Sequence, residues 1–420
     1  MTGRGSERRV GATYRRALRR PDFVALYLAR VLSDWGDQLA RVALAALVLH
    51  QSNSALFAAA AFAVSYLPAV FGQALLGPLS DRIPRRTVMV ACDVLRSLGL
   101  VLLVLAVTQG APIWLLLVML FLVELSGAPF FAASRALLAE MFEERPLFLR
   151  ANSLMQMTFQ FNQVAGVAIG GIVVATLGTQ QALWLDAATF VASGLLIFAF
   201  VTANAAARPA TVHGLGGWVA DVREGVRYLY RDVPTRSLFL VAIVTLLAFT
   251  APEAVSLPYA REHGGSTAAG GILLAAGPLG AVAGVLLVSR WTPVVQVSRI
   301  LPMALLLPLP LLGVVLDPPW AVAGVLFVLA GVCQGFMVPL MATFTLLSPD
   351  ELRGRLSAVA GSGFALVTAT SFLAVGALAD ATNPALAVVV SAVLTLLLLV
   401  PVWRSWPRRE LAEAAERAYS

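Results

Sequence analysis

The amino-acid sequence predicts an all-α integral membrane protein with twelve transmembrane helices. The 420 residues are 59% hydrophobic and only 13% charged, with a mean hydropathy of +0.83. Soluble domains have roughly 45–50% apolar and about 25% charged residues. Apolar runs of the length that crosses a bilayer, about 20 residues, follow one another along almost the whole chain, and arginines lie in alternate connections between them. Little sequence is left for a soluble enzyme domain.

Charges, prolines and turn residues divide the chain into twelve apolar runs. The runs span 22–50, 54–79, 87–108, 112–140, 152–178, 181–203, 237–260, 268–290, 298–316, 319–347, 356–380 and 384–404. We expect a six-helix bundle over 22–203 and a second over 237–404, with tails at 1–21 and 405–420. The linker 204–236 contains apolar residues at helical spacing, which predicts an amphipathic helix at the membrane surface.

The arginines test the number of crossings. Junctions that follow odd-numbered runs contain no arginine except Arg261, whereas the other junctions and both tails contain nearly all the rest. Cytoplasmic loops carry the excess of basic residues, so both termini are predicted to be cytoplasmic, in the inner (plasma) membrane. An odd number of helices would place the two arginine-rich tails on opposite sides. Twelve is therefore the predicted count.

The remaining composition excludes several classes of function. The formal charge of +7 invites a nucleic-acid interpretation, but all 30 basic residues are arginines and most lie in short stretches between apolar runs. No nucleotide-binding loop of the type that cradles phosphates is present. The three histidines are far apart in sequence, and Cys92 and Cys333 lie alone inside apolar runs. We expect no metal site, no cofactor and no nucleic-acid partner.

One loop carries a family resemblance. The segment Gly77-Pro-Leu-Ser-Asp81-Arg82-Ile-Pro84-Arg85-Arg86 resembles the motif between helices two and three of major facilitator superfamily transporters. The resemblance implies a fold of two pseudo-symmetric six-helix bundles. Charges at this helix end can latch one of two conformational states, although the arginines alone would also serve as topology determinants. The latch is assigned to Gly77, Asp81, Arg82, Arg85, Arg86, Asp93 and Arg96.

Other segments resemble one branch of that superfamily, which contains the enterobactin exporter and the macrolide efflux proteins. They are Ser33-Asp34-Trp-Gly36-Asp37-Gln38, Arg150-Ala-Asn152, Leu185-Asp186-Ala-Ala-Thr-Phe190 and Asp350-Glu351-Leu-Arg353-Gly354-Arg355. Pro84 departs from the usual glycine of the superfamily motif but fits this branch. The resemblance implies a monomeric exporter of drug-, macrolide- or siderophore-like molecules. A glycine-rich fifth helix, Gly166–Gly171, is associated with antiport in the superfamily, but small residues at this spacing also let helices approach closely.

Ionisable residues inside the membrane are expensive and need a partner or a role. Arg30, Asp34, Asp37 and Arg41 share one face of the first helix and can pair locally as Arg30–Asp34 and Asp37–Arg41, or line a cavity. Glu124 has no basic residue within one turn of its own helix. The superfamily resemblance implies that helices one, four, seven and ten line the cavity.

We therefore expect Glu124 to exchange protons during transport, with Asp34 or Asp37 as second candidates and Glu253 of the seventh helix also at the cavity. The alternative is that Glu124 is paired across helices or only binds a cationic substrate. Asp93 and Asp186 are expected nearer the membrane faces, in structural pairs. A cluster of amides in the fifth helix suggests a hydrogen-bonding cavity wall. The cavity residues are predicted to be Arg30, Arg41, Gln156, Gln160 and Gln163.

Two other functions fit the sequence less directly. An integral-membrane enzyme would need a nucleophile with a base, or paired histidines and carboxylates, at one membrane face, and the sequence contains neither arrangement. A lysophospholipid or metabolite carrier of the same fold is compatible with every feature above. The predicted partners are thus a small-molecule substrate, protons as the coupling ion and the lipid bilayer.

Overall fold

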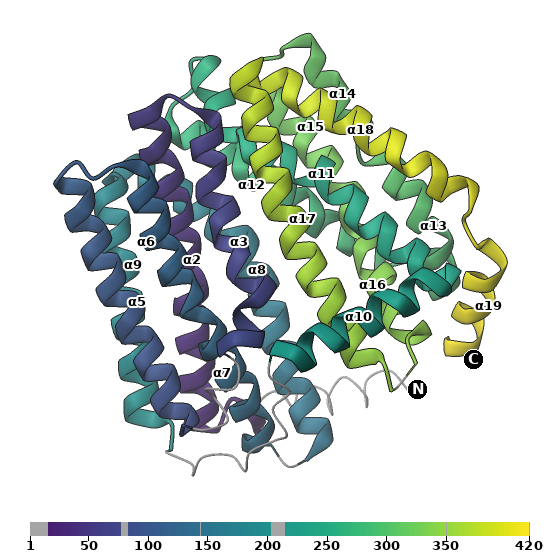
Figure 1. Ribbon diagram of the computed structural model, residues 1–420, viewed down its shortest axis with the longest axis horizontal. Coiled ribbons are helices and arrows are strands. Elements are labelled where there is room, and N and C mark those ends of the chain that lie inside the picture. The colour runs from purple at the N-terminus through teal and green to yellow at the C-terminus, as the bar shows by residue number, and fades with distance from the viewer. Residues whose placement is uncertain (1–15, 77–82, 143, 203–214, 350, 420) are drawn as a thin grey trace, which may run out of the picture. The chain divides into compact units, whose positions relative to one another are not determined.

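The computed structural model describes residues 16–76, 83–142, 144–202, 215–349 and 351–419, and every regular element among them is a helix. The helices of the first half are α2 (Pro21–Ser52), α3 (Ala55–Leu76), α5 (Arg85–Thr108), α6 (Ile113–Leu125), α7 (Gly127–Met141), α8 (Arg145–Leu177) and α9 (Thr179–Phe200). The later helices are α10 (Leu215–Arg231), α11 (Val233–Glu262), α12 (Thr267–Val288), α13 (Pro293–Leu306), α14 (Leu309–Leu312), η1 (Gly313–Leu316), α15 (Trp320–Cys333), η2 (Gln334–Phe336), α16 (Met337–Leu347), α17 (Arg353–Ala381), α18 (Pro384–Arg404) and α19 (Arg408–Tyr419). Figure 1 shows this arrangement.

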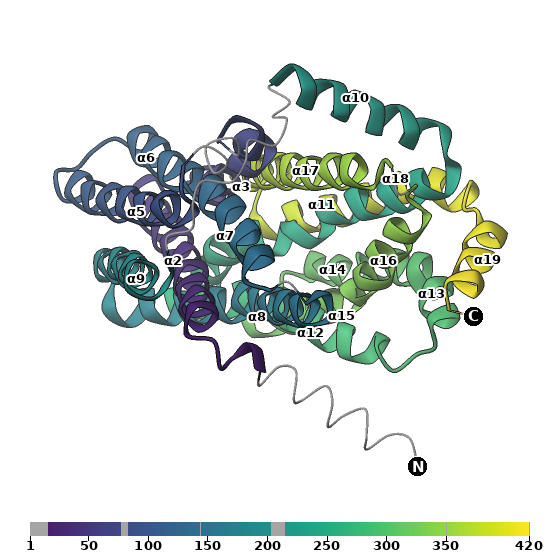
Figure 2. The same ribbon diagram turned by 90° about the horizontal axis from the view of Figure 1, so that it is seen from below.

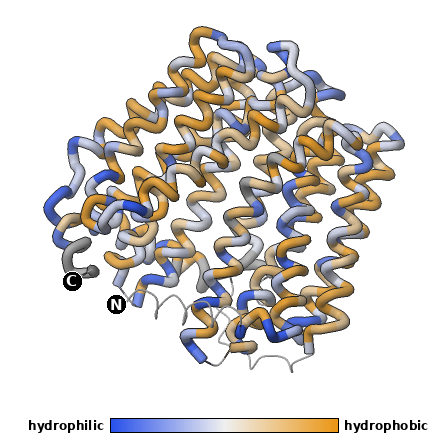
Figure 3. The backbone as a smooth tube through the Cα atoms, turned by 180° about the vertical axis from the view of Figure 1, so that it is seen from behind, coloured by the Kyte–Doolittle hydropathy of each residue, from blue (hydrophilic) through white to orange (hydrophobic). Residues whose placement is uncertain are grey.

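Nine helical segments in the described part of the chain are long and apolar enough to cross a membrane. Apolar residues dominate these segments and hydrophilic residues gather at their ends (Figure 3). The helix α2 is also long enough, but its middle carries Arg30, Asp34, Asp37 and Arg41. In α3 and α8 the described apolar stretches, Ala55–Val70 and Ala165–Leu177, are shorter. The all-helical membrane class is confirmed, and the count of twelve stays a prediction.

Two predicted membrane helices are interrupted near their centres. The run 112–140 is divided between α6 and α7 at Ser126, and the run 319–347 is divided between α15 and α16 by the 3-10 turn η2. The Ser126 hydroxyl donates to the Val123 carbonyl at 2.7 Å, which occupies a backbone acceptor beside the break. The first break lies two residues after Glu124, so it shapes the surroundings of that carboxylate.

Several helices begin and end with local signals that the sequence contains. Asp232 accepts a hydrogen bond from the Thr235 amide at 2.9 Å before α11, and Asn383 accepts one from the Leu386 amide at 2.7 Å before α18. Both caps are followed by a proline in the first turn, where its missing N–H costs nothing. Gly110 and Gly178 have φ values of +69° and +89° in the turns after α5 and α8. These turns reverse the chain between consecutive helices.

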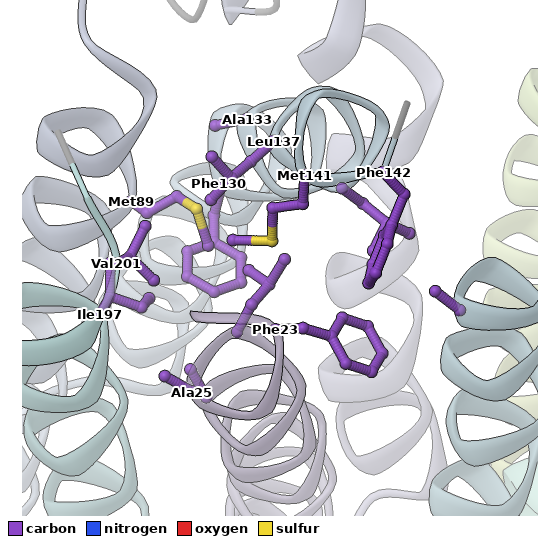
Figure 4. Close-up of a cluster of buried hydrophobic side chains, with 14 of the residues drawn as sticks. Phe23, Ala25, Met89, Phe130, Ala133, Leu137, Met141, Phe142, Ile197 and Val201 are labelled. Atoms are coloured by element: carbon purple, nitrogen blue, oxygen red, sulfur yellow. The ribbon is translucent and has the colours of Figure 1, made fainter. Parts of the chain in front are cut away.

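The chain divides into two compact units. Unit 1 comprises residues 1–43, 71–170 and 177–212, and unit 2 comprises 44–70, 171–176 and 213–420. In unit 1, α5 packs against α6, α7 and α9. Buried apolar side chains from α2, α5, α7 and α9 form its core, among them Phe23, Met89, Phe130 and Ile197 (Figure 4).

In unit 2, α12 and α15 approach so closely that their backbones touch. A Cβ atom added at Gly280 would lie 2.1 Å from the Val328 carbonyl oxygen, and one at Gly331 would lie 2.1 Å from the Gly277 carbonyl oxygen. A Cβ at Gly171 would likewise meet Gly271 Cα at 2.3 Å. Glycine at these positions therefore allows close helix contact, which is the packing role considered above for small residues in the fifth helix.

The helix α10 lies at the periphery of unit 2, packed against α17 and α11 (Figure 2). It is the amphipathic helix predicted in the linker 204–236. Gly225 and Leu229 are buried, and a Cβ at Gly225 would meet Val359 Cγ2 of α17 at 2.7 Å. One face of α10 is thus anchored to the unit, and the others are left exposed.

Candidate functional site

The candidate site is built on the charged face of α2 in unit 1. Asp34 and Asp37 are 5% and 7% exposed, so the stripe points into the unit rather than outward. Arg30 Nε donates to Asp34 Oδ1 at 3.1 Å, which is the local pair that the spacing predicts. The Arg30 guanidinium also lies over the Phe131 ring, 3.9 Å from its centroid. An aromatic face attracts a cation, so this arginine is held from two sides.

Asp37 is paired with an arginine on another helix. Arg96 of α5 is 0% exposed, and its Nη2 donates to Asp37 Oδ1 at 2.8 Å. The Arg96 guanidinium lies 4.5 Å from the centroid of Phe190 of α9, and a Cβ at Gly127 would meet Nη2 at 2.9 Å. From the sequence, Arg96 was predicted to belong to the latch, and its pairing with Asp37 was not predicted. The structure places Arg96 in the interior of unit 1.

Glu124 of α6 is paired across helices with Arg41 of α2. Arg41 Nε donates to Glu124 Oε1 at 3.1 Å, with the two side chains 13% and 7% exposed. Arg41 Nη1 also donates to Gln38 Oε1 at 3.4 Å. Our expectation of a local Asp37–Arg41 pair overlooked both interhelical partners, and cross-helix pairing of Glu124, the alternative considered from the sequence, is what the structure contains.

Two further carboxyl groups complete the cluster. Asp93 of α5 accepts from the Ser193 hydroxyl at 2.7 Å, and the Ser33 hydroxyl of α2 donates to Ser193 at 3.3 Å. Asp186 of α9 is 0% exposed and accepts from the Thr189 hydroxyl at 3.3 Å. Within the described residues, one oxygen of each carboxyl group has no hydrogen-bond partner. Both are buried within unit 1, and their expected position nearer the membrane faces stays a prediction.

The cluster brings together segments that are far apart in sequence. A Cβ added at Gly36 would lie 2.0 Å from Asp186 Oδ1 and 2.5 Å from Thr189 Oγ1, so the backbone of α2 abuts the carboxyl group of α9. The segments around Ser33–Gln38 and Leu185–Phe190, which carried part of the family resemblance, therefore face each other. The contact between Gly36 and Asp186 was not predicted from the sequence, although each residue lies in a segment that carried the family resemblance.

This cluster contains five buried carboxyl groups and three guanidinium groups, of which one is buried and two are partly exposed. The carboxyl groups are Asp34, Asp37, Asp93, Glu124 and Asp186, and the guanidinium groups are Arg30, Arg41 and Arg96. Buried charges are strongly disfavoured unless they are paired. In the part of the chain that the structure describes, Asp93 and Asp186 have hydroxyl partners but no ion pair. The cluster thus has more sites for negative charge than guanidinium groups to neutralise them.

Aromatic and amide side chains border the Arg30 end of the cluster. The Tyr27 and Thr158 hydroxyls lie 2.7 Å apart, and Trp35 Nε1 donates to Asn162 Oδ1 at 2.7 Å. The ring centroid of Phe159 lies 5.8 Å from the Arg30 guanidinium. Gln156 of α8 is exposed. The side chains of Gln160 and Gln163 lie outside the described residues.

The predicted latch is described only in part. Gly77, Asp81 and Arg82 lie outside the described residues. Arg85 forms an ion pair with Glu140 of α7, and Arg86 donates to the Phe198 carbonyl of α9 with its guanidinium 4.7 Å from the Phe198 ring centroid. These contacts tie the start of α5 to its neighbours within unit 1. Glu253 lies partly buried in α11 of unit 2.

Comparison with protein-family models matches residues 26–347 to the Major Facilitator Superfamily. The chain is 28% identical over 373 residues to the multidrug efflux pump Tap of Mycolicibacterium fortuitum, which covers 86% of this chain and 90% of Tap. It is 29% identical over 227 residues to YkuC of Bacillus subtilis, an uncharacterised MFS-type transporter, and there the match spans 52% of this chain and only 51% of YkuC.

The fold also resembles solved transporter structures. A crystal structure of a mutant of the nucleoside transporter NupG has a TM-score of 0.72 and 12% sequence identity, and covers 91% of this chain and 99% of that chain. At this level of identity the likeness shows the fold alone. The family-model match over residues 26–347, rather than this likeness of fold, confirms the superfamily expected from the loop at Gly77–Arg86.

Proposed function

Because the chain belongs to the Major Facilitator Superfamily, we propose that it is a secondary active exporter that moves small organic molecules by proton antiport with alternating access. It is a transporter rather than an enzyme, and a multi-pass protein of the plasma membrane. The direction and the cargo class are supported by the likeness to the efflux pump Tap over most of both chains. Drug-, macrolide- or siderophore-like molecules are the cargo that we propose.

We further propose that twelve helices cross the membrane, with both termini in the cytoplasm. The nine apolar segments are supplemented by α2, α3 and α8, which reach 32, 22 and 33 residues. A helix of about 20 residues spans the hydrocarbon core. The charges that lower the hydropathy of α2 point into unit 1, so they do not meet lipid. Twelve crossings agree with the alternation of arginines along the sequence.

The observation that carries the proton antiport is the surplus of buried carboxyl groups. If all five were ionised, three guanidinium groups would leave two negative charges uncompensated among largely buried side chains. Such charges are removed by binding protons. The unpartnered oxygens of Asp93 and Asp186 are suitable positions for protons that stay bound. We assign the proton exchange to Glu124 because its ion pair with Arg41, at 3.1 Å, joins two helices, whereas the Arg30–Asp34 pair lies within α2.

A proton and the arginine compete for the Glu124 carboxylate. When a proton binds Glu124, the ion pair to Arg41 is lost, and the Gln38 amide oxygen, 3.4 Å from Arg41 Nη1, remains to hold the guanidinium. When the proton leaves, the pair between α2 and α6 forms again. An ion pair that joins two helices only in the deprotonated form couples proton binding to helix packing, which alternating access requires. We place the cargo near Arg30, whose guanidinium lies over the Phe131 ring at 3.9 Å from its centroid.

The test is transport by the purified protein in liposomes with an imposed pH gradient. Ethidium, a macrolide, a siderophore and a lysophospholipid serve as separate cargoes. We expect cargo to move against its gradient while protons move the opposite way. Glu124→Gln should abolish both movements but leave cargo exchange without a gradient intact, because the glutamine still accepts from Arg41.

The matched control is Glu144→Gln, a carboxylate in an exposed pair with Arg16 (59% and 67% exposed side chains). It should transport like the wild type. Full uphill transport by Glu124→Gln with unchanged pH dependence would contradict the proton role. Movement of the lysophospholipid alone would replace the drug-like cargo by lipid, and a chemical product formed without net movement would contradict the transport proposal.

A further inference from the structure

A groove on the outside of unit 2 is lined by three arginines from one helix. Arg223, Arg227 and Arg231 recur every four residues of α10 and border an open cavity of about 810 Å³. The other lining residues are Val219, Ala220, Glu224, Tyr228 and Leu352. Residues spaced by four lie along one side of a helix. The helix therefore presents three guanidinium groups to one concave surface, which we call the arginine groove.

Glu224, the carboxylate among the described residues of the lining, does not neutralise these arginines. Glu224 forms an ion pair with Arg355 of α17, so its charge is already compensated by an arginine outside the lining. Arg223, Arg227 and Arg231 are all exposed. The groove thus has a strong positive charge, and a guanidinium group binds phosphate oxygens in a two-pronged geometry.

An exposed apolar edge lies next to the arginines on the same helix. Val219, Val226 and Tyr230 are 55%, 51% and 78% exposed. At 100° per residue, they fall within about 40° of one another and adjoin Arg223 on the helical wheel. The buried Gly225 and Leu229 occupy the other side of this edge, toward α17. The helix therefore has three sectors: one anchored to the protein, one apolar and exposed, and one basic.

A soluble anion would be bound by the basic sector alone and would leave the apolar edge in water. A helix with an exposed apolar edge flanked by arginines instead fits the membrane interface, where apolar residues enter the acyl boundary and basic residues stay among the headgroups. Basic residues at this depth attract anionic phospholipids. We propose that the arginine groove of α10 binds the phosphate headgroup of an anionic phospholipid, whose acyl chains lie along the Val219–Val226–Tyr230 edge.

The experiment measures binding of fluorescent phosphatidylglycerol and phosphatidylcholine to the purified full-length transporter in detergent. We expect the wild type to bind phosphatidylglycerol at least tenfold more tightly, with affinity falling as salt is raised from 50 to 500 mM. The variant Arg223→Gln/Arg227→Gln/Arg231→Gln should lose this preference. Each arginine near a membrane surface accounts for roughly a fivefold change in affinity, so the loss should be at least tenfold in total.

The matched control, Arg290→Gln/Arg299→Gln/Arg409→Gln, removes three exposed arginines elsewhere in unit 2 and should keep the preference. Equal loss in both triple variants would show a general charge effect and overturn the proposal. Displacement of the lipid by millimolar inorganic phosphate would indicate a site for a free anion instead. Replacing Val219 and Val226 by serine should weaken binding of the long-chain lipid but not of glycerol phosphate. An equal effect of this replacement on both ligands would also overturn the proposal. Unchanged thermal unfolding of each variant establishes that the groove, rather than the fold, was altered.

Discussion

Glu124 Oε1 accepts a hydrogen bond from Arg41 Nε at 3.1 Å, so α6 and α2 are joined by a nearly buried ion pair between residues 83 positions apart. Arg41 lies one helical turn from Asp37, and Asp37 is held by Arg96 of α5. Each partner compensates a charge that would otherwise be buried alone. Such a pair adds little net stability, but losing one member of it is expensive.

The first prediction concerns this pair. Arg41→Met should destabilise the protein by about 3–5 kcal/mol, because it leaves the Glu124 carboxylate buried without its cation. The double variant Arg41→Met/Glu124→Leu should recover most of that loss. Reversible unfolding of the purified protein in mixed micelles gives the four free energies of the cycle.

The control for this cycle is the exposed pair Arg16–Glu144, whose removal should change stability by about 1 kcal/mol or less. If Arg41→Met/Glu124→Leu is as unstable as Arg41→Met alone, the two residues do not compensate each other. The proton role of Glu124 would then lose its structural basis.

A second prediction follows from the contact between α2 and α9. Gly36→Ala should cost about 1–3 kcal/mol, because the new Cβ would lie 2.0 Å from Asp186 Oδ1 and overpack a buried polar contact. Thermal unfolding measures the effect. The control is Gly361→Ala in α17, where nothing lies within 4 Å. That variant should be neutral or more stable, because alanine favours a helix over glycine. A stable Gly36→Ala protein would mean that the α2–α9 contact is looser than described.

The sequence was sufficient to predict the membrane class and the positions of most helices, because apolar runs and the charges, prolines and turn residues that divide them are local signals. The pairing of Arg30 with Asp34 was also local and followed from spacing. The interhelical partners of Asp37 and Arg41 did not follow from spacing. An interhelical pair depends on how each helix is rotated and on which helices are neighbours. A single sequence contains no direct record of helix rotation or of which helices are neighbours.

The burial of Asp93 and Asp186 shows the same limit. Both are expected near the membrane faces from their distance to the ends of apolar runs, and that expectation concerns depth rather than burial within the protein. The structure buries them against Ser193 and Thr189. Distance along a helix gives depth in the bilayer, but it does not say which face of the helix is covered. The break at Ser126 was also missed, since Leu125-Ser126-Gly127 contains no proline and the hydropathy continues across it.

A third prediction tests the close approach of α12 and α15. Gly280→Ala should destabilise more than Gly36→Ala, because its Cβ would meet the Val328 carbonyl of the backbone at 2.1 Å, and a backbone yields less easily than a side chain. Gly277→Ala, three residues earlier on the same helix, meets only the Phe249 ring at 3.9 Å and should be tolerated. Cysteine cross-linking between α12 and α15 measures their approach in each variant, and thermal unfolding measures the stability of each variant. Equal tolerance of the two variants would contradict the backbone contact.

The last prediction concerns a helix cap within unit 2. Asp380, near the end of α17, accepts hydrogen bonds from the Ala55 amide at 2.5 Å and the Leu56 amide at 3.2 Å, and from the Ser54 hydroxyl. A carboxylate at a helix N-terminus satisfies amides that have no partner within the helix and interacts favourably with the helix dipole. The stacked rings of Phe62 and Phe372, 5.3 Å apart, continue the contact between α3 and α17.

Asp380→Ala should therefore lower stability by about 1 kcal/mol, the usual cost of losing a cap, and should increase amide hydrogen exchange at the start of α3. Asp380→Asn keeps an acceptor oxygen for the amides but loses the charge, so its exchange rates should fall between those of the wild type and the alanine variant. Unfolding in mixed micelles and hydrogen exchange read by mass spectrometry give the two measurements. Residues 55–58 could instead be equally protected from hydrogen exchange in all three proteins. Asp380 would then not hold this helix end, and the Phe62–Phe372 stack would be sufficient to keep α3 against α17.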